Sequence, residues 1–297
     1  MNNPLTVVDY DFEWALKDHY TVPRSKPGYI TREEVIEFYG TLGVQGVELM
    51  HAYWEDYPPA DLKKLVSDAG LPITCYVFHS DLAVPSAERQ AGIDRAFHLL
   101  DRTAELGTSR AMIVPGTAKT DVPIEQQTAW MVEGLRPCAE KAQSMGLTLL
   151  AENCDYGPIR PLMGRGSQCR DICAQVASPA FRLIYDAGCA LCGEEDTMDT
   201  LHTMAPFMVH VHLKNNKLTK PGETADRYNE SISGANRYIG ATLDGGELDL
   251  RPVFAELDRL GYRGELLIEY QGMEDPRRVV PHNIEYLRKT VGRSATA

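Results

Sequence analysis

The segments GLTLLAEN (residues 146–153) and FRLIYDAG (residues 181–188) decide the fold. Each is a strand-sized run whose apolar residues follow one another instead of alternating with polar ones. This continuity is typical of strands that are buried on both faces of a parallel sheet. Six further runs of the same kind lie at residues 5–10, 43–50, 71–78, 109–116, 207–214 and 264–271.

Helical patterns separate these runs. One begins at Thr31, where Glu34 three residues later predicts a capping box, and its apolar side chains repeat at helical spacing. A glycine follows five of the helical patterns and precedes the next apolar run. At this position a helix commonly ends with one residue in the left-handed backbone conformation, which glycine adopts easily. These glycines are Gly43, Gly70, Gly107, Gly146 and Gly261.

Eight strands alternating with helices predict an α/β fold with a parallel sheet, and the length of 297 residues suits a single-domain (β/α)8 TIM barrel. The alternative is a doubly wound dinucleotide-binding fold. Its glycine fingerprint is missing, because Gly164 and Gly166 lack the third glycine and fall in mid-chain. We therefore expect one barrel domain over residues 1–297, with a long loop insertion at about 215–249 between the last two strands.

The composition excludes several classes of protein. Hydrophobic residues make up 43% and charged residues 24%, which are globular values, and the formal net charge is −12. Such a charge repels phosphate backbones, so nucleic acid is an unexpected partner. No apolar stretch is long enough to span a membrane, and the seven cysteines are spread in the manner of reduced thiols. We expect a cytoplasmic protein with no membrane partner.

The last four predicted strands each carry a polar residue near the carboxyl end. These residues are Glu152, Asp186, His212 and Glu269. In a barrel they would converge at the mouth, where three unpaired carboxylates would repel one another. One divalent cation would resolve this conflict. Three oxygen donors and one nitrogen donor suit Mn2+, Mg2+ or Co2+, and we expect Mn2+.

The chain also resembles a known family in several motifs. GVQGVEL, LLAEN, YDAG, HVHLKN and GYRGELLIE are similar to motifs of the sugar phosphate isomerase/epimerase superfamily, the xylose-isomerase-like TIM barrels. Its members include ketose 3-epimerases, hydroxypyruvate isomerases and keto-inositol dehydratases. The resemblance implies that Glu152, Asp186, His212 and Glu269 bind one metal ion. It also implies that Glu152 and Glu269 act as acid and base on opposite faces of the substrate.

Two positions depart from the family pattern. Many members have D-x-x-H after the sixth strand, but here the histidine position is Cys189, and the usual H-x-K-D ends in Asn215. The loss of that imidazole puts both a standard ketose epimerase and a three-metal endonuclease arrangement in doubt.

Further residues are candidates for substrate binding. His51 and His79 follow the second and third strands, and Trp54 lies in an aromatic loop after the second. Lys214 and His210 are expected on the same strand face as His212. His210 is expected to support His212 by packing or hydrogen bonding, without binding the metal itself. Each of these residues could instead be a structural group of its strand or loop. Within the insertion, Arg227 or Arg237 could contact a substrate oxygen if the segment closes as a lid, whereas a solvated insertion is the alternative.

The function that these features predict is a divalent-metal-dependent isomerase or epimerase. It would act on a sugar or keto-sugar through proton abstraction and a metal-stabilised ene-diolate. A lyase at the same metal site is the alternative, by dehydration of a keto-inositol or keto-sugar acid or by β-elimination of a 3-keto-glycoside, including C-glycosides. A non-catalytic sugar-binding subunit is a third hypothesis. A homo-oligomer is expected, or a hetero-oligomer if the protein is a lyase.

Overall fold

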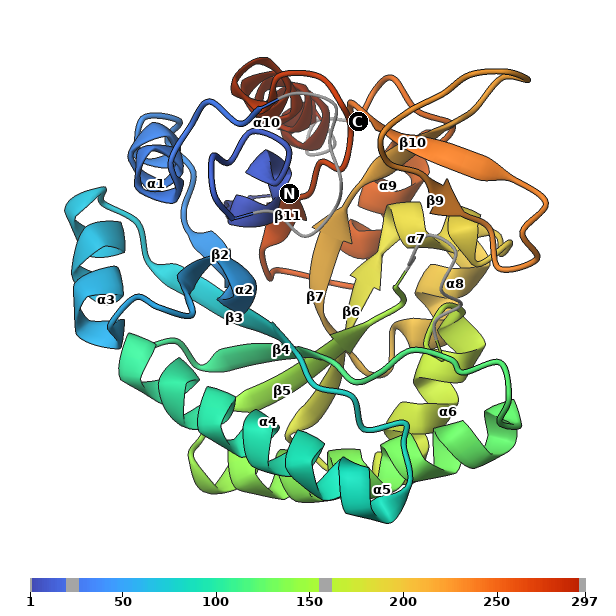
Figure 1. Cartoon of the computed structure of the whole chain (residues 1–297). Helices are drawn as coiled ribbons and strands as arrows, with labels where there is room; N and C mark the ends of the chain where they lie inside the picture. The colour runs from blue at the N-terminus through green and yellow to red at the C-terminus, as the bar shows by residue number, and fades with distance from the viewer. Residues whose placement is uncertain (1, 20–26, 155–161, 294–297) are drawn as a thin grey trace.

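The eight predicted apolar runs form the strands of one closed parallel barrel, which is the predicted TIM barrel (Figure 1). The computed structural model describes residues 2–19, 27–154 and 162–293. Around the barrel the strands follow the order β1-β11-β7-β6-β5-β4-β3-β2. Their bounds are Leu5–Val8 (β1), Val47–Met50 (β2), Ile73–His79 (β3), Arg110–Val114 (β4), Thr148–Glu152 (β5), Phe181–Asp186 (β6), Met208–Leu213 (β7) and Leu266–Ile268 (β11).

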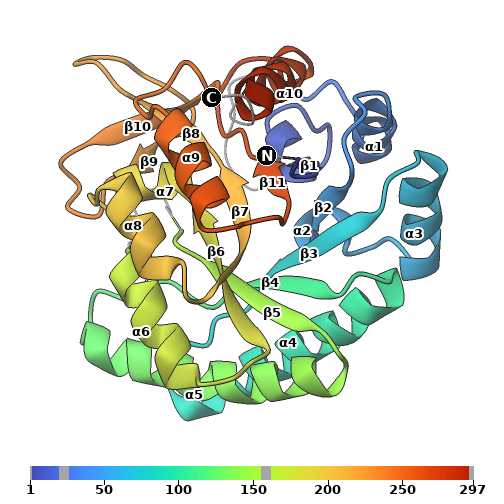
Figure 2. The ribbon, with the colours of Figure 1, turned by 180° about the vertical axis from the view of Figure 1, so that it is seen from behind.

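Helices surround the barrel on its outside (Figures 1 and 2). The principal ones are α1 (Arg32–Gly40), α3 (Pro59–Asp68), α4 (Ser86–Leu106), α5 (Ile124–Ser144), α6 (Gly166–Val176), α8 (Thr197–Met204), α9 (Arg251–Arg259) and α10 (Pro276–Arg293). Short helical turns follow three strand ends directly: η1 (Asp9–Phe12), α2 (His51–Trp54) and α7 (Ala187–Cys192). Within the described ranges, no helix is both long and apolar enough to cross a membrane.

The local signals at the helix ends agree with the structure. Thr31 and Glu34 form the predicted capping box at the start of α1. All five predicted glycines have positive φ angles, between 64° at Gly43 and 82° at Gly107. All seven cysteines fall within the described ranges, and each is buried and outside any disulfide.

The connection between β7 and β11 is more ordered than the predicted loop. It contains a three-stranded antiparallel sheet in the order β8-β10-β9, formed by Asn215–Leu218, Arg237–Ala241 and Asn229–Glu230. This sheet lies beside α7 in both views of the ribbon (Figures 1 and 2). We call residues 215–249 the insertion. Its strands are short and mostly polar, so they lack the apolar pattern that marks the barrel strands.

Candidate active site and metal centre

The register of the barrel brings the four predicted metal ligands together. Asp186 pairs with His212 across β6 and β7, and Glu269, directly after β11, donates its backbone N–H to the carbonyl of Leu213 at 3.0 Å. Glu152 ends β5, the neighbour of β6. One ligand atom from each of Glu152, Asp186, His212 and Glu269 lies within 4.8 Å of the others. We call these four residues the ligand cluster.

His212 lies at the centre of this cluster. Its Nδ1 is 3.1 Å from Oε2 of Glu152 and 3.4 Å from Oε2 of Glu269, and its Nε2 is 3.6 Å from Oε2 of Glu48. Burial opposes a charged imidazole, but the carboxylates of Glu152 and Glu269 hold the pKa of His212 well above its usual range. In the absence of a metal ion, the ring therefore acts as the cation of the cluster.

Lys214 supplies a second positive charge next to the carboxylates. Its side chain is fully buried, and Nζ lies 3.1 Å from Oδ2 of Asp186 and 3.3 Å from Oε1 of Glu269. Gln271 donates a further hydrogen bond of 2.6 Å to Oε1 of Glu269. Burial raises the pKa of the Glu269 carboxyl, yet Lys214 and His212 outweigh it and lower this pKa to about 2. Glu269 is therefore ionised at neutral pH.

The start of α7 fixes the position of Asp186. Oδ1 of Asp186 caps this helix by accepting hydrogen bonds from the N–H groups of Gly188 and Cys189, at 2.7 and 3.1 Å. The side chain of Asn153 holds the backbone of Asp186 from the adjacent strand end with two hydrogen bonds. A Cβ on Gly188 would lie 2.8 Å from the carbonyl oxygen of Lys214, so the helix can approach β7 closely only with glycine here. Cys189, at the usual histidine position, is buried in this turn.

A second polar group lies deeper in the barrel, behind His212. Oε1 of Glu48 and Nε2 of His210 are 2.6 Å apart, and both side chains are fully buried. Burial raises the pKa of Glu48, but His210 and His212 together hold it well below its usual range. Glu48, His210 and His212 could also hold an ion. The short Glu48–His210 contact instead makes this group a hydrogen-bonded support for His212.

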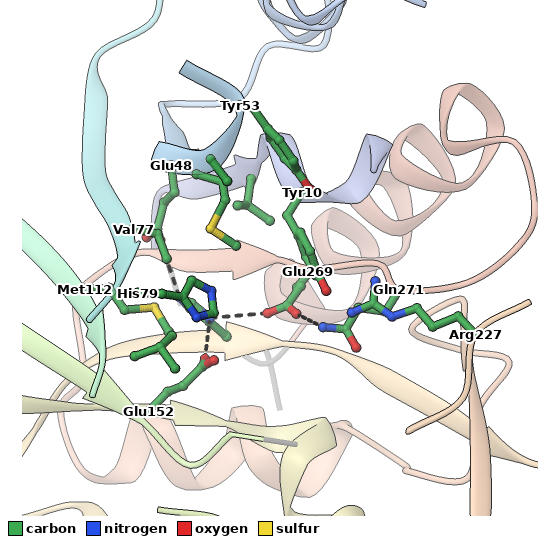
Figure 3. A pocket seen from close by; sticks show the side chains of 15 residues that line it. Tyr10, Glu48, Tyr53, Val77, His79, Met112, Glu152, Arg227, Glu269 and Gln271 are labelled. Atoms are coloured by element: carbon green, nitrogen blue, oxygen red, sulfur yellow. Dashed lines mark hydrogen bonds and ion pairs between the residues drawn. The ribbon is translucent and has the colours of Figure 1, made fainter. Parts of the chain in front are cut away.

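A cavity of about 370 Å3 opens above the ligand cluster. Glu152, His212 and Glu269 are polar residues of its lining. Arg227 and Gln271 lie to one side of Glu269 (Figure 3). Val77 and Met112 lie to the opposite side in the same view. The volume falls within the range of roughly 300–1,000 Å3 that is usual for small-molecule sites.

Two of the predicted substrate-binding residues line this cavity. His79 is the last residue of β3 and lines the cavity at its rim. Arg227 reaches the cavity from the insertion, where Nη1 lies 2.6 Å from Oε2 of Glu13 and the guanidinium stacks 4.8 Å from the ring centre of Tyr10. Burial lowers the pKa of Arg227 to about 10, so the group keeps its charge at neutral pH.

The other predicted residues lie outside the cavity lining. Nδ1 of His51 is 2.8 Å from the Tyr76 hydroxyl, and burial lowers the pKa of His51 to about 4. Trp54 is buried and donates its indole N–H to Oδ2 of Asp9 at 2.6 Å. Lys214 contacts the ligand cluster from below the cavity surface. Arg237 is exposed and pairs with Glu230.

Three polar residues of the site were not singled out from the sequence. Glu48, Tyr10 and Gln271 line the cavity. Glu48 stands inside the apolar run VELM, and a charge within a buried strand is the signal that could have revealed it. Gln271 lies two residues after Glu269, and Tyr10 follows the first strand, but neither residue type carries a signal of its own.

Comparison with known proteins agrees with the barrel fold. The model of the xylose isomerase-like TIM barrel family matches residues 36–290. The chain belongs to this family. Among curated xylose isomerase-like relatives, an inosose dehydratase of Geobacillus thermodenitrificans is 23% identical over 286 residues, covering 89% of this chain and 91% of the relative.

Solved structures share the same barrel. An L-ribulose 3-epimerase superposes with a TM-score of 0.75 at 16% identity, covering 99% of this chain and 96% of its own. A 3-keto-D-glucoside 4-epimerase from E. coli gives 0.71 at 14% identity, covering 97% and 100%. A xylose isomerase-like protein from Mycobacterium smegmatis, solved in complex with magnesium, gives 0.71 at 15% identity, covering 99% and 98%.

The ligand cluster of this xylose isomerase-like barrel fits a divalent cation. Oε2 of Glu152 and both ring nitrogens of His212 are buried, and among the described residues they have no hydrogen-bond partner beyond the ion pairs of His212 with Glu48, Glu152 and Glu269. Three carboxylates and one imidazole are the donor set that Mn2+ or Mg2+ accepts, and these ions suit carboxylate-rich sites. Glu152, Asp186, His212 and Glu269 would therefore hold the ion.

Proposed function

We propose that this protein is a divalent-metal-dependent isomerase or epimerase that acts on a sugar or keto-sugar. The observation that carries the proposal is the convergence of the ligand cluster at the floor of a small cavity, with two of its carboxylates accessible from that cavity. The names of related proteins, an inosose dehydratase and two sugar epimerases, support a carbohydrate substrate with a carbonyl group.

The chemistry begins with a proton on the carbon next to a carbonyl. Glu152, Asp186, His212 and Glu269 would hold a divalent cation, which when bound would supply Lewis acidity to the carbonyl. Mn2+ is the expected ion, with Mg2+ or Co2+ as alternatives, because the donor set is rich in oxygen.

Glu152 and Glu269 are the proposed catalytic residues. They approach His212 from different strands, β5 and β11, which lie on opposite sides of β7 in the barrel order. In the proposed cycle the ionised Glu269 removes the proton to give an ene-diolate, and Glu152, which enters the cycle carrying a proton, gives it to the opposite face or to the neighbouring carbon. Exchange with solvent then removes the proton from Glu269 and restores the one on Glu152. Lys214 and Gln271 keep Glu269 ionised and oriented for this transfer.

Substrate hydroxyls bind on the charged side of the cavity in this proposal. Arg227 keeps a positive charge there, and Tyr10 and Gln271 add donors and acceptors. His79 at the rim offers a further contact. His51, Lys214 and Trp54 act indirectly, because they contact residues around the cavity rather than line it.

A lyase reaction is the second candidate, and the curated relatives favour it. An inosose dehydratase aligns along 91% of its own length with this chain. The same proton abstraction would be followed by loss of water, or of another leaving group, from the carbon beyond. The carboxylate that does not take the proton would donate one to the departing oxygen.

Solvent exchange distinguishes these functions. The protein is incubated in D2O with Mn2+ and either a ketose, a 3-keto-glucoside or a keto-inositol. Deuterium in recovered or epimerised sugar supports the isomerase, whereas an enone or a released leaving group supports the lyase. Glu152→Gln and Glu269→Gln should each lower turnover by about 10²–10⁴-fold, since each removes an acid/base group. The exposed Glu140→Gln is the matched control. Full turnover in the presence of a chelator would refute both functions.

A further inference from the structure

The cavity has two unlike sides. The side formed by β1, β11 and the insertion carries one apolar residue, Val8, and the polar residues Tyr10, Gln271 and Arg227. The side formed by β2, β3 and β4 carries Met50, Val77, Met112 and Val114. Figure 3 shows Val77 and Met112 on the other side of Glu269 from Arg227 and Gln271. The ligand cluster therefore lies between a polar side and an apolar side.

The apolar side is continuous with a hydrophobic cluster inside the barrel. Val77, Met112 and Val114 are between 3% and 4% exposed, and they pack with the buried side chains beneath them, Cys75, Leu150 and Ile184. We call the apolar side, formed by Met50, Val77, Met112 and Val114, the wall. Because buried side chains pack beneath it, the wall is a fixed surface of the cavity.

A hydroxyl group directed at this wall would lose its hydrogen bonds to water. The backbone groups of β2, β3 and β4 are paired with one another in the barrel, and the wall side chains offer no strong donor or acceptor. Among the described lining residues on the side of β2, β3 and β4, polar atoms come from His79 at the end of β3, from Glu48 and from Tyr53 in α2. Glu48 contacts His210 through Oε1, and its Oε2 faces Nε2 of His212 at 3.6 Å. A polyol with a hydroxyl on every carbon is thus a poor match for this side.

Apolar groups fit the same surface well. Burying them against Val77, Met112 and Val114 removes apolar area from water on both partners. Met50 and Met112 add two thioether side chains, which adapt to irregular shapes and make favourable contacts with aromatic rings.

We infer that the substrate of this site is a keto-sugar that carries an aromatic substituent, which sits on Met50, Val77, Met112 and Val114 while the sugar faces the ligand cluster and Arg227. This inference rests on the proposed function, because it takes the ligand cluster as the place where the keto-sugar reacts. It adds the chemical class of the group attached to the sugar.

The test compares phenyl and methyl 3-keto-β-D-glucopyranosides with the Mn2+-loaded protein. We expect the phenyl compound to bind and react at least roughly ten-fold better, which is the size of effect that a hydrophobic pocket gives for added apolar groups. Met112→Gln and Val114→Thr should each reduce the phenyl-to-methyl ratio. Val209→Thr, at an exposed valine of β7, is the matched control and should leave the ratio unchanged.

A second measurement avoids the variants altogether. Calorimetry on the unaltered protein should give a more negative heat-capacity change for the phenyl compound than for the methyl compound, because more apolar surface is buried. Equal affinities and equal heat-capacity changes would overturn the inference. If deuterium exchange occurs without a phenyl preference, the proposed function stands and the inference fails. A phenyl preference in binding with neither deuterium exchange nor elimination would refute the proposed function, and with it the inference that the aromatic keto-sugar is a substrate.

Discussion

His212 contacts more charged groups of the candidate site than its neighbours do. Glu152 and Glu269 face its Nδ1, and Glu48 faces its Nε2 from inside the barrel. A metal-ligating imidazole is oriented by the group that faces its other nitrogen. Glu48, in turn, is fixed by the 2.6 Å contact with His210. The orientation of this candidate metal ligand thus depends on Glu48, which lies on β2 and far from the ligand cluster in the sequence.

This arrangement predicts an effect of Glu48 on metal affinity. Glu48→Gln should weaken Mn2+ binding by about 10–100-fold, which is the usual effect of removing the partner of a metal-ligating histidine. Isothermal titration of the cation-free protein measures the change, and the exposed Glu55→Gln serves as control. An unchanged dissociation constant in a folded Glu48→Gln variant would contradict the role of Glu48.

Protonation of His212 predicts that metal binding depends on pH. Burial opposes the charge, but Glu152 and Glu269 raise the pKa of His212, so the cation-free protein holds a proton there. A metal ligand must be the neutral ring, so binding releases this proton and affinity should increase as the pH rises. Titrations in two buffers of different ionisation enthalpy measure the release. Affinity that is independent of pH would refute the prediction.

The sequence predicted the residues of the ligand cluster because each one interrupts an apolar strand at its end, where a buried charge needs a reason. It did not predict Glu48, whose partner His210 lies 162 positions away. Nor did it separate His79, which lines the cavity, from His51, which bonds to Tyr76. Both histidines lie at the end of a strand. They differ in the path of the chain there, because His79 is the last residue of β3 whereas His51 begins the helix α2.

Hydrogen bonds between buried amide side chains connect the insertion with the candidate active site. Gln271 donates to Glu269, Asn229 donates to Gln271 at 2.9 Å and to Asn216 at 3.3 Å, and Asn216 donates to the carbonyl of Gly188. Two residues before Asn229, Arg227 of the insertion pairs with Glu13, which lies next to η1. The insertion therefore connects the α7 side of the barrel mouth with the β1 side.

Breaking these hydrogen bonds should loosen the insertion and weaken substrate binding together. Asn229→Ala removes the donor to Gln271, so we expect faster proteolysis within residues 215–249 and a higher KM. Lys220→Gln, an exposed change in the same segment, is the control. Substrate should slow cleavage if the insertion closes as a lid, and equal rates with and without substrate would contradict closure.

The strands and helices of the barrel were predictable because each leaves a local pattern: apolar runs, a capping box at Thr31 and glycines at helix ends. The strands β8 to β10 were not, since they are two to five residues long and are stabilised by side-chain amides instead of apolar burial. Their pairing depends on contacts between distant residues, which local spacing does not encode.

At the scale of the whole barrel, repulsion between carboxylates is concentrated at the mouth. This repulsion links metal binding to the stability of the fold. Three carboxylates gather at the ends of β5, β6 and β11, with His212 and Lys214 as the compensating charges from the chain itself. A bound cation adds attraction to all three carboxylates and is absent from the unfolded state. Ligands that bind only the folded state increase the free energy of unfolding.

Saturating Mn2+ should therefore raise the melting temperature. At about 100 times the dissociation constant the gain is about 2.7 kcal/mol, which corresponds to roughly 4 °C for a domain of 297 residues. Asp186→Asn should abolish the rise, because the amide removes a negative ligand. An asparagine can still cap α7 through its oxygen, so this variant should remain folded without metal. Scanning calorimetry with Mn2+ and with chelator measures both proteins. An equal rise in Asp186→Asn would show that the cation stabilises the barrel from somewhere other than the ligand cluster.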